Sequence, residues 1–269
     1  MAIVVDGHVH FYPEFSVPEF FAAAWRNFEK VQDTHGLGED ADYVIFLTEG
    51  GKHDMFSKLC DMADAGADDV HSTGALKRTK EPNSLVVEED GRRLYVFGGR
   101  QYVSSENIEL LSLFSREAIP DKSMPLGELA QKVAAVGGIV VIPWGVGKWF
   151  GKRGEVVKTL FEQKIDFPLF CGDSGNRPLF WPTPALLSFA TEKGVPLLSG
   201  SDPLPLASHC ERVASSGAIL LDGKISVSHP GASLREQLVT GKRRAAFGTR
   251  MNPLRFFYDQ FHMNVMSRF

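Results

Sequence analysis

The chain opens with Met1-Ala-Ile-Val-Val-Asp-Gly-His-Val-His-Phe11, and the residue types in this segment determine the architecture and the chemistry that we expect. The β-branched run at 3–5 predicts a short strand that is buried on both faces. His8 and His10 follow this run closely. Side chains two residues apart on extended backbone point to the same side, so the two imidazoles should project together. Two neutral imidazoles at the end of a buried strand predict half of a metal site.

Further along the chain, predicted strands alternate with predicted helices. Strands are expected at 3–5, 43–48, 84–88, 93–97, 108–114, 139–142, 167–170, 196–198 and 218–221, and helices at 18–31, 54–65, 126–136, 154–164, 183–194, 234–239 and 253–266. The apolar spacing of 108–114 also suits a helix. Asp90-Gly91 is a strong hairpin signal. We therefore predict one α/β domain over residues 1–269, a distorted TIM-like (β/α)7–8 barrel with a β-hairpin insertion.

The composition argues against several classes of protein. Hydrophobic residues make up 43% and charged residues 23% of the 269 positions, as in ordinary globular proteins. The net charge of −4 provides no basic field for nucleic acid or for an anionic membrane. The N-terminus lacks the pattern of a signal peptide, and no stretch approaches the roughly 20 apolar residues of a membrane span. Three widely spaced cysteines, Cys60, Cys171 and Cys210, favour a reducing compartment, and we expect a cytoplasmic protein.

A carboxylate follows a strand late in the chain. The run Val195-Pro-Leu-Leu-Ser-Gly-Ser-Asp202 places Asp202 at the end of a predicted buried strand, and the small residues before it permit close approach of neighbouring backbone. In a barrel, a late strand lies beside the first strand, so Asp202 is expected to face His8 and His10. It would bind the metal or take a proton from a metal-bound water. The simpler alternative is an aspartate that caps the next helix.

Asp6-Gly-His-Val-His10 at the start, together with Gly200-Ser-Asp202 late in the chain, resembles the PHP (polymerase and histidinol phosphatase) family. The same two signatures also occur in the broader metal-dependent amidohydrolase superfamily. The resemblance implies a barrel of seven or eight strands that holds one to three divalent ions at the C-terminal ends of its strands. It also implies hydrolysis by a metal-activated water. PHP members typically cleave phosphoesters, whereas amidohydrolases cleave amide, ester or related bonds.

The sequence departs from the PHP pattern at several positions. Leu204 stands where the resemblance implies a histidine, and Trp144 replaces another. Where a glutamate is implied, the sequence offers Arg100 and Gln101. A trinuclear cluster is therefore not expected, and the minimal site consists of the two N-terminal histidines and the late aspartate.

Other residues are weaker candidates for completing the metal site. Glu49 and His53 follow the second predicted strand, although His53 is equally explained as a helix residue without a role. Glu106 could replace the missing glutamate, although solvent exposure is the simpler interpretation. Lys148 could take the place of a bridging carbamylated lysine if the chain resembles an amidohydrolase. The remaining histidines, which have no partner at ligand spacing, are His35, His71, His209, His229 and His262.

Two loops that follow strands predict an anionic small-molecule substrate. They combine glycines with Lys148 and Arg177, which are expected to bind a phosphate or carboxylate. Trp144 could wall a pocket for a ring or a sugar, or it could pack against the rim of the barrel. Asp173 could reach the pocket or simply form a turn. The alternative for both loops is a mobile surface with solvated cations.

The sequence thus predicts a metal-dependent hydrolase. His8 and His10 would hold a divalent Zn, Mn or Fe ion, and Asp202 would act as a ligand or a base. A phosphoester or another anionic small molecule is the favoured substrate, and neither nucleic acid nor membrane is expected as a partner. Two alternatives remain open, namely an amidohydrolase that acts on a C–N or ester bond and a degenerate barrel that binds without catalysing.

Overall fold

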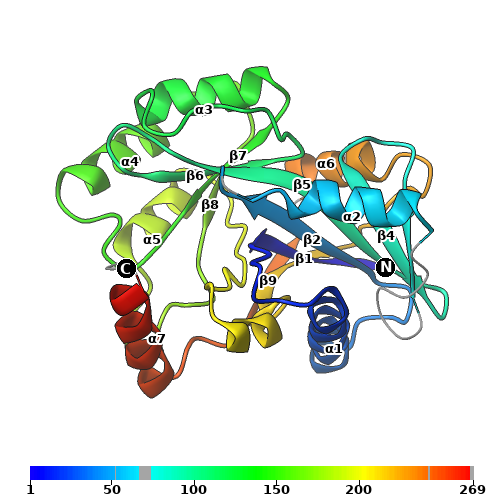
Figure 1. The fold of residues 1–269 in the computed structure, drawn as a ribbon. Coiled ribbons are helices and arrows are strands. Elements are labelled where there is room, and N and C mark those ends of the chain that lie inside the picture. The colour runs from blue at the N-terminus through cyan, green and yellow to red at the C-terminus, as the bar shows by residue number, and fades with distance from the viewer. Residues whose placement is uncertain (52, 67–73, 242, 267–269) are drawn as a thin grey trace.

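The computed structural model describes residues 1–51, 53–66, 74–241 and 243–266 and is built around one ten-stranded sheet (Figure 1). His71 lies outside the described residues. The strands are β1 (Ala2–Val9), β2 (Asp42–Glu49), β3 (Ala75–Arg78), β4 (Ser84–Glu89), β5 (Arg92–Val103), β6 (Glu109–Leu113), β7 (Ile139–Pro143), β8 (Leu169–Gly172), β9 (Ser216–Leu221) and β10 (Arg244–Gly248). The helices are α1 (Val17–His35), α2 (Met55–Asp64), α3 (Leu126–Ala135), α4 (Lys152–Glu162), α5 (Ala185–Glu192), α6 (Pro230–Thr240), α7 (Pro253–Met266) and the 3₁₀ helix η1 (Ala207–Arg212).

The sheet is mixed and curls into an incomplete barrel with the strand order β10-β9-β1-β2-β5-β6-β7-β8. The pairs β1–β2, β2–β5 and β7–β8 are parallel, whereas β5–β6, β6–β7, β1–β9 and β9–β10 are antiparallel. The α/β class and the barrel-like curl agree with the prediction, but the fully parallel sheet does not. One reason is that the short connection between β5 and β6, residues 104–108, can join only antiparallel neighbours.

The insertion at residues 84–97 is a β-hairpin, as predicted. Strands β4 and β5 pair in antiparallel register around Asp90 and Gly91, whose φ angles are +47° and +79°. Two successive positive φ angles are typical of the tight turn that matches the twist of a hairpin. Strand β3 adds to the outer edge of β4. Residues 109–113 form strand β6, so the helical alternative for that region is wrong.

Residues 196–202 fill the gap between β8 and β1 at the C-terminal ends of these strands. On one side, the Gly200 N–H donates to the carbonyl oxygen of Asp173 at 3.2 Å. On the other side, the Asp202 N–H donates to the carbonyl oxygen of His8 at 2.8 Å. The expectation that this late segment lies beside the first strand is confirmed. The segment makes isolated bridges rather than a continuous strand.

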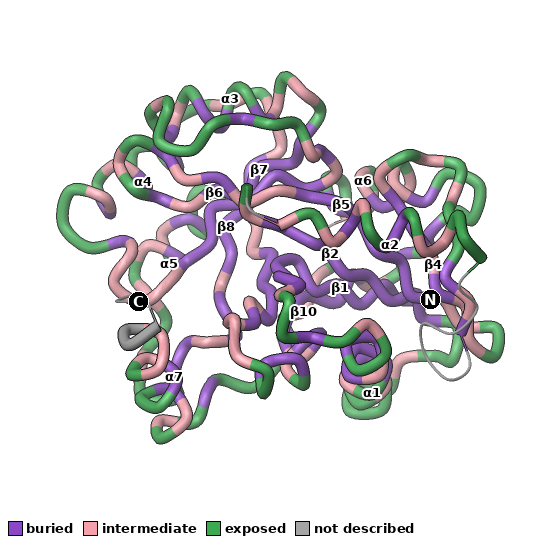
Figure 2. The backbone as a smooth tube through the Cα atoms, viewed as in Figure 1, coloured by how far each residue is buried: buried purple, intermediate pink, exposed green. Residues whose placement is uncertain are grey.

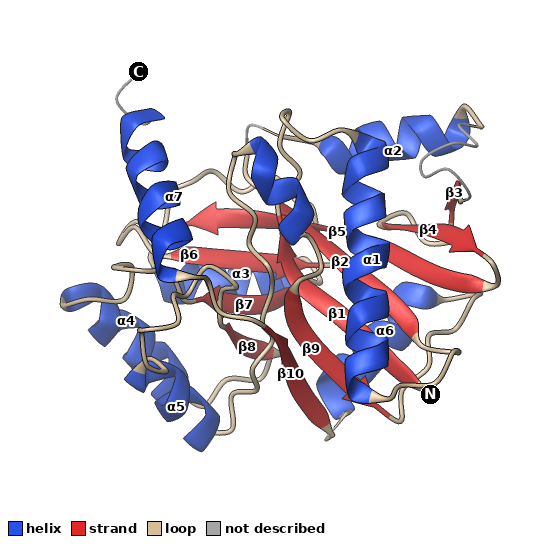
Figure 3. Ribbon diagram, turned by 90° about the horizontal axis from the view of Figure 1, so that it is seen from below, coloured by secondary structure: helices blue, strands red, loops and turns tan. Residues whose placement is uncertain are grey.

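Three clusters of buried apolar side chains hold the helices to the sheet. Helices α1 and α2 cover one face at β1, β2, β4 and β5, and α3, α4 and α5 cover the sheet at β6 to β8. The opposite face packs around Leu234 and Leu238 of α6. Seen from below, α1 crosses the strands on the side opposite α6 (Figure 3). Apart from β3 and β10, the strands are mostly buried, and the exposed residues gather on the helices and loops (Figure 2). Among the described helices, none combines the length and apolarity that crossing a membrane requires.

Gly200 permits the close approach of residues 196–202 to β1. A Cβ atom at this position would lie 2.3 Å from the backbone nitrogen of His8 and 2.7 Å from its Cα. We predict that Gly200→Ala lowers the free energy of unfolding by about 1–3 kcal/mol, as overpacking does in buried sites. Urea denaturation measures this value.

Gly127, in α3, is the matched control. A Cβ there meets no atom within 4 Å. Gly127→Ala should therefore raise the free energy of unfolding by about 0.4–1 kcal/mol, because alanine lowers the conformational entropy of the unfolded chain. Equal stabilities of the two variants would contradict the importance of the close contact at Gly200.

Candidate metal centre

Three metal-ligating side chains meet where β1 ends. His8 lies in β1 and His10 just beyond it, and their Nε2 atoms are 3.0 Å apart. Asp202 Oδ1 lies 3.6 Å from the Nε2 of His8 and 3.7 Å from that of His10. All three ligand atoms fall within 4.8 Å of one another. The predicted convergence of these residues is confirmed.

The spacing of these atoms fits a shared divalent ion. Ligands held about 2.1 Å from one ion are separated by about 3.0–3.4 Å at angles of about 90–110° and by about 3.6 Å at about 120°. The His8–His10 distance falls in the first range, and the two distances to Asp202 lie close to the second value. The His8 Nε2 atom also faces Gln101 Oε1 at 3.2 Å. A ring nitrogen carries at most one proton, so the His8 Nε2 cannot satisfy His10, Gln101 and Asp202 by donation. A cation at the centre would satisfy all of these atoms at once.

The electrostatics of the cluster keep His10 and Asp202 in their ligating forms. Burial, together with the neighbouring His8, lowers the pKa of His10 to about 3, so this imidazole is neutral near pH 7. Burial alone would raise the pKa of Asp202, but His8, His10 and Lys148 outweigh it, and the pKa lies below its usual value. The Ser174 hydroxyl donates to Asp202 Oδ2 at 2.9 Å. The other oxygen, Oδ1, is thereby directed at the histidines.

Asp6 holds the backbone around the cluster in place. Its fully buried carboxylate accepts hydrogen bonds from the backbone N–H groups of Ser201 and Ala214, both at 2.9 Å, and of His8 at 3.3 Å. Burial raises the pKa of Asp6 to about 7, although these hydrogen bonds act to lower it. Asp6 was not predicted to have a separate role. In the structure it positions both the first strand and the segment that carries Asp202.

Glu49 and Glu106 lie outside the cluster. Both oxygens of the Glu49 carboxylate accept from the first two backbone N–H groups of α2, at 2.6 and 3.0 Å. Glu106 accepts from the Leu126 N–H, the first of α3, at 3.1 Å. Each carboxylate therefore caps a helix, where it offsets the partial positive charge of the N-terminus.

His53 lies one aromatic ring away from the cluster. The ring of Tyr12 is 5.6 Å from that of His10 and 5.9 Å from that of His53, measured between centroids. His53 thus borders the centre without sharing the convergent position of the three ligands.

Arg177 and Asp173 bind each other. The Nε and Nη2 atoms of Arg177 donate to the Asp173 carboxylate over 2.7–3.1 Å, and Nη1 donates to the Trp181 carbonyl at 2.9 Å. Arg177 is only 5% exposed. We expected these two side chains to line a substrate pocket. In the structure their polar atoms instead bind each other and fix the loop after β8.

Lys148 lies at the edge of the metal centre, whereas Trp144 is part of the core. Lys148 forms an ion pair with Glu109, keeps 40% of its side chain exposed and acts electrostatically on both His10 and Asp202. Trp144 is buried, with its ring 6.1 Å from that of Trp181. Of the two alternatives for Trp144, the structure supports packing at the barrel rim.

The positions that depart from the PHP pattern differ in where their side chains lie. Arg100 is held by long contacts to the carbonyl oxygens of Arg116, at 3.4 Å, and His53, at 3.5 Å. The Leu204 backbone donates to His209 rather than to the cluster. Gln101, by contrast, reaches His8. The neutral amide of Gln101 was not recognised as a site residue because carboxylates, histidines and cysteines were the groups expected to bind metal.

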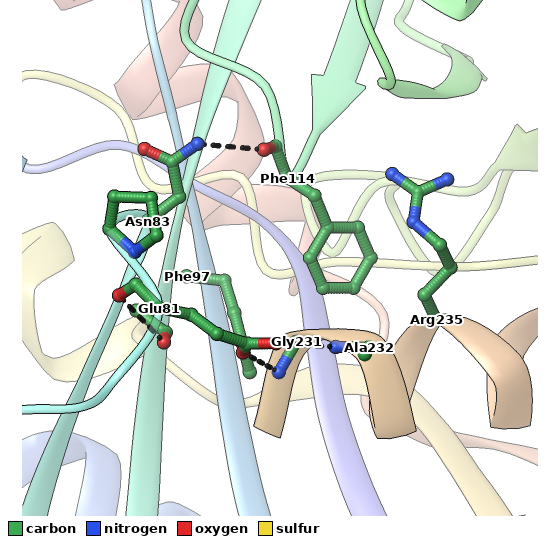
Figure 4. A pocket seen from close by; sticks show the side chains of 9 residues that line it. Glu81, Asn83, Phe97, Phe114, Gly231, Ala232 and Arg235 are labelled. Carbon is green, nitrogen blue, oxygen red and sulfur yellow. Dashed lines mark hydrogen bonds between the residues drawn. The ribbon is translucent and has the colours of Figure 1, made fainter. Parts of the chain in front are cut away.

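Two of the cavities differ in how they relate to the candidate site residues. One, of about 230 Å³, lies between the β4–β5 region and α6 and has no candidate site residue in its wall (Figure 4). In that cavity Glu81 accepts from the backbone of Gly231 and Ala232, and Asn83 donates to the Phe114 carbonyl at 3.0 Å. The other cavity, of about 290 Å³, has Gln101 in its wall but none of the three clustered residues.

Solved structures share this arrangement of elements. PsfC from Pseudomonas syringae PB-5123 matches with a TM-score of 0.53 and 12% identity, over 98% of this chain and 99% of PsfC. An Endonuclease Q complex with a 27-mer duplex substrate bearing an abasic lesion matches with a TM-score of 0.54 and 12% identity, over 93% of this chain and 60% of that chain. The chain has the fold of these proteins. A two-domain protein from Bacteroides vulgatus ATCC 8482 is described as containing a predicted PHP-like metal-dependent phosphoesterase. It matches with a TM-score of 0.48 and 12% identity, over 92% of this chain and 65% of that chain.

The barrel-like α/β fold expected from the sequence is thereby confirmed as a fold shared with PsfC and Endonuclease Q. Structural matches at about 12% sequence identity show that the fold is shared, but they do not show that the activity is shared. Neither a protein-family model nor a curated protein matches the sequence.

The structural role of Arg177 yields a stability prediction. Arg177→Met should lower the free energy of unfolding by about 3 kcal/mol, because it leaves the partly buried Asp173 carboxylate without its counter-charge. The matched control is Arg243→Met, which breaks an exposed ion pair with Asp222 and should change stability by less than about 1 kcal/mol. Chemical denaturation of both variants measures the difference, and an Arg177 variant as stable as the wild type would contradict this role.

Proposed function

We propose that this protein is a metal-dependent hydrolase that activates a water at the cluster of His8, His10 and Asp202. The observation that supports the proposal is the convergence of two imidazole nitrogens and one carboxylate oxygen within 4.8 Å. His8, His10 and Asp202 would hold a divalent ion there, which would supply Lewis-acid chemistry, lowering the pKa of water towards neutrality and polarising the bond to be cleaved. Zn, Mn and Fe all accept this mixture of imidazole and carboxylate donors.

Within this proposal each side chain has one task. His8 and His10 hold the ion with neutral nitrogens, which the low pKa of His10 supports. Asp202 would serve as a ligand or as the base that accepts a proton from water, while the Ser174 hydroxyl donates to its Oδ2 atom. The cluster therefore combines ion binding with a base in one rigid unit.

We further propose an anionic small molecule as the substrate, with a phosphoester favoured over an amide or ester. Lys148 supports this choice, because its ammonium group acts on the cluster and is partly exposed. The group would exchange its Glu109 partner for a substrate oxygen. Endonuclease Q is described with a DNA duplex, but the net charge of −4 on this chain does not favour such a polyanion. The three cysteines are free and buried, which supports a reducing compartment such as the cytoplasm.

The first test is metal content, measured by plasma mass spectrometry on protein purified without chelators or a His-tag. The wild type should carry at least one equivalent of Zn, Mn or Fe, and the His8→Ala/His10→Ala variant should carry none. A His35→Ala/His229→Ala variant, which removes two exposed histidines, is the matched control and should match the wild type. Absence of metal from the wild type, even after reconstitution, would contradict the hydrolase proposal and leave a barrel that binds without catalysing.

The role of Lys148 predicts a separate kinetic effect. With an aryl phosphate substrate, Lys148→Gln should raise KM about 10-fold and change kcat less, because the ammonium group binds the phosphoryl charge in both ground and transition states. Lys158→Gln is the control, since Lys158 is also half exposed but pairs with Glu162 on α4. Equal kinetics of the two variants would exclude Lys148 from substrate binding.

A further inference from the structure

Gln101 enters the metal centre from the side opposite Asp202. It lies in β5, which pairs with β2, and β2 in turn pairs with β1. Asp202 reaches the same place from residues 196–202, which bond to β1 on its other side. The polar atoms around the His8 Nε2 are therefore supplied from both flanks of β1, as in a site that encloses an ion.

The distance between Gln101 and His8 is the spacing of two ligands on one ion. Gln101 Oε1 and His8 Nε2 are 3.2 Å apart, within the roughly 3.0–3.4 Å that separates neighbouring ligands at metal–ligand distances of about 2.1 Å. A carboxamide oxygen has two lone pairs and is an established ligand for hard and borderline cations. When the His8 Nε2 presents its lone pair to an ion, it cannot also donate a proton to Gln101. The closeness of the two atoms is then explained by a shared cation.

We propose that Gln101 Oε1 is a fourth ligand of the metal centre, which is then a mononuclear site of two histidines, one aspartate and one glutamine. This inference rests on the proposed metal-dependent function. Within the part of the chain that the structure describes, no other histidine, cysteine or acidic side chain joins the three clustered ligands. The site therefore has one anionic ligand and no carboxylate opposite it that could bridge to a second ion.

Substitutions at Gln101 leave the surroundings largely intact. The side chain is half-buried and forms part of the wall of the 290 Å³ cavity, so a shorter or isosteric residue creates no closed void. Gln101→Ala removes the oxygen, and Gln101→Glu keeps the shape while adding a negative charge. Gln163→Ala, at an exposed glutamine after α4, is the matched control.

The experiment titrates Co²⁺ and Zn²⁺ into the metal-free wild type and the three variants. Zn²⁺ affinity is measured by competition with a chromophoric chelator, and the ligand set is followed by the visible absorption of Co²⁺. We expect one equivalent in the wild type, an affinity at least about 10-fold lower in Gln101→Ala and about 10-fold higher in Gln101→Glu. The Co²⁺ bands should shift in both Gln101 variants and stay unchanged in Gln163→Ala.

The outcomes separate this inference from the function on which it rests. If the wild type binds one ion and the Co²⁺ bands are the same in every variant, Gln101 is only a hydrogen-bond neighbour of His8, and the inference fails while the metal site stands. Two equivalents in the wild type would overturn the mononuclear assignment. If the wild type binds neither ion, the proposed function fails as well.

Discussion

The three hydrogen bonds accepted by the Asp6 carboxylate are the interaction on which the rest of the site depends. They fasten β1 to the N–H groups of Ser201 and Ala214, which lie about two hundred residues later in the chain. Each buried N–H left without a partner would destabilise the fold by about 1–3 kcal/mol. Together with the backbone hydrogen bonds of Gly7 and Asp202, this side chain ties residues 199–202 to β1 at the edge where the candidate ligands lie, and so fixes the position of Asp202 relative to the histidines.

Asp202 is held in a conformation that most residues avoid. Its φ angle is +49°, in the left-handed region, where a residue with a Cβ is disfavoured by roughly 1–2 kcal/mol. Two hydrogen bonds hold this geometry. The Asp202 N–H donates to the His8 carbonyl oxygen, and the Ser174 hydroxyl donates to the Asp202 carboxylate. Strain of this kind persists where the surrounding structure enforces it, and it is concentrated at functional sites. The carboxylate is thus directed at the histidines before any ion arrives.

Local pattern in the sequence was sufficient to predict most of the elements and the convergence of the three clustered side chains, because strand ends and spacing are local properties. It missed β3 and β10, and the strand expected at 196–198 makes only isolated bridges. The mixed sheet was not predictable in this way, since the relative direction of β5 and β6 depends on how the chain returns between them. Arg177 and Asp173 are four residues apart in a polar loop, a spacing that fits a mutual ion pair as well as two independent substrate contacts. Only the surrounding structure distinguishes these cases. Glu49 likewise follows a strand, as a ligand should, but its carboxylate caps the helix that comes next.

The departures from the PHP pattern act together on the charge of the centre. Leucine, arginine and glutamine stand where the pattern has additional ligands, so that Asp202 is the one anionic group among the ligand atoms that converge in the described residues. Lys148 and the partly buried Arg212 add positive charge that acts on Asp202. Two dications about 4 Å apart would repel each other strongly, even at an effective dielectric constant of about 20. The negative charge of one carboxylate cannot offset this repulsion. One ion beside positive side chains leaves a centre whose net charge is positive. With the single ion proposed above, such a centre would suit the proposed anionic substrate, because the charge of the ion exceeds that of the one carboxylate among its ligands.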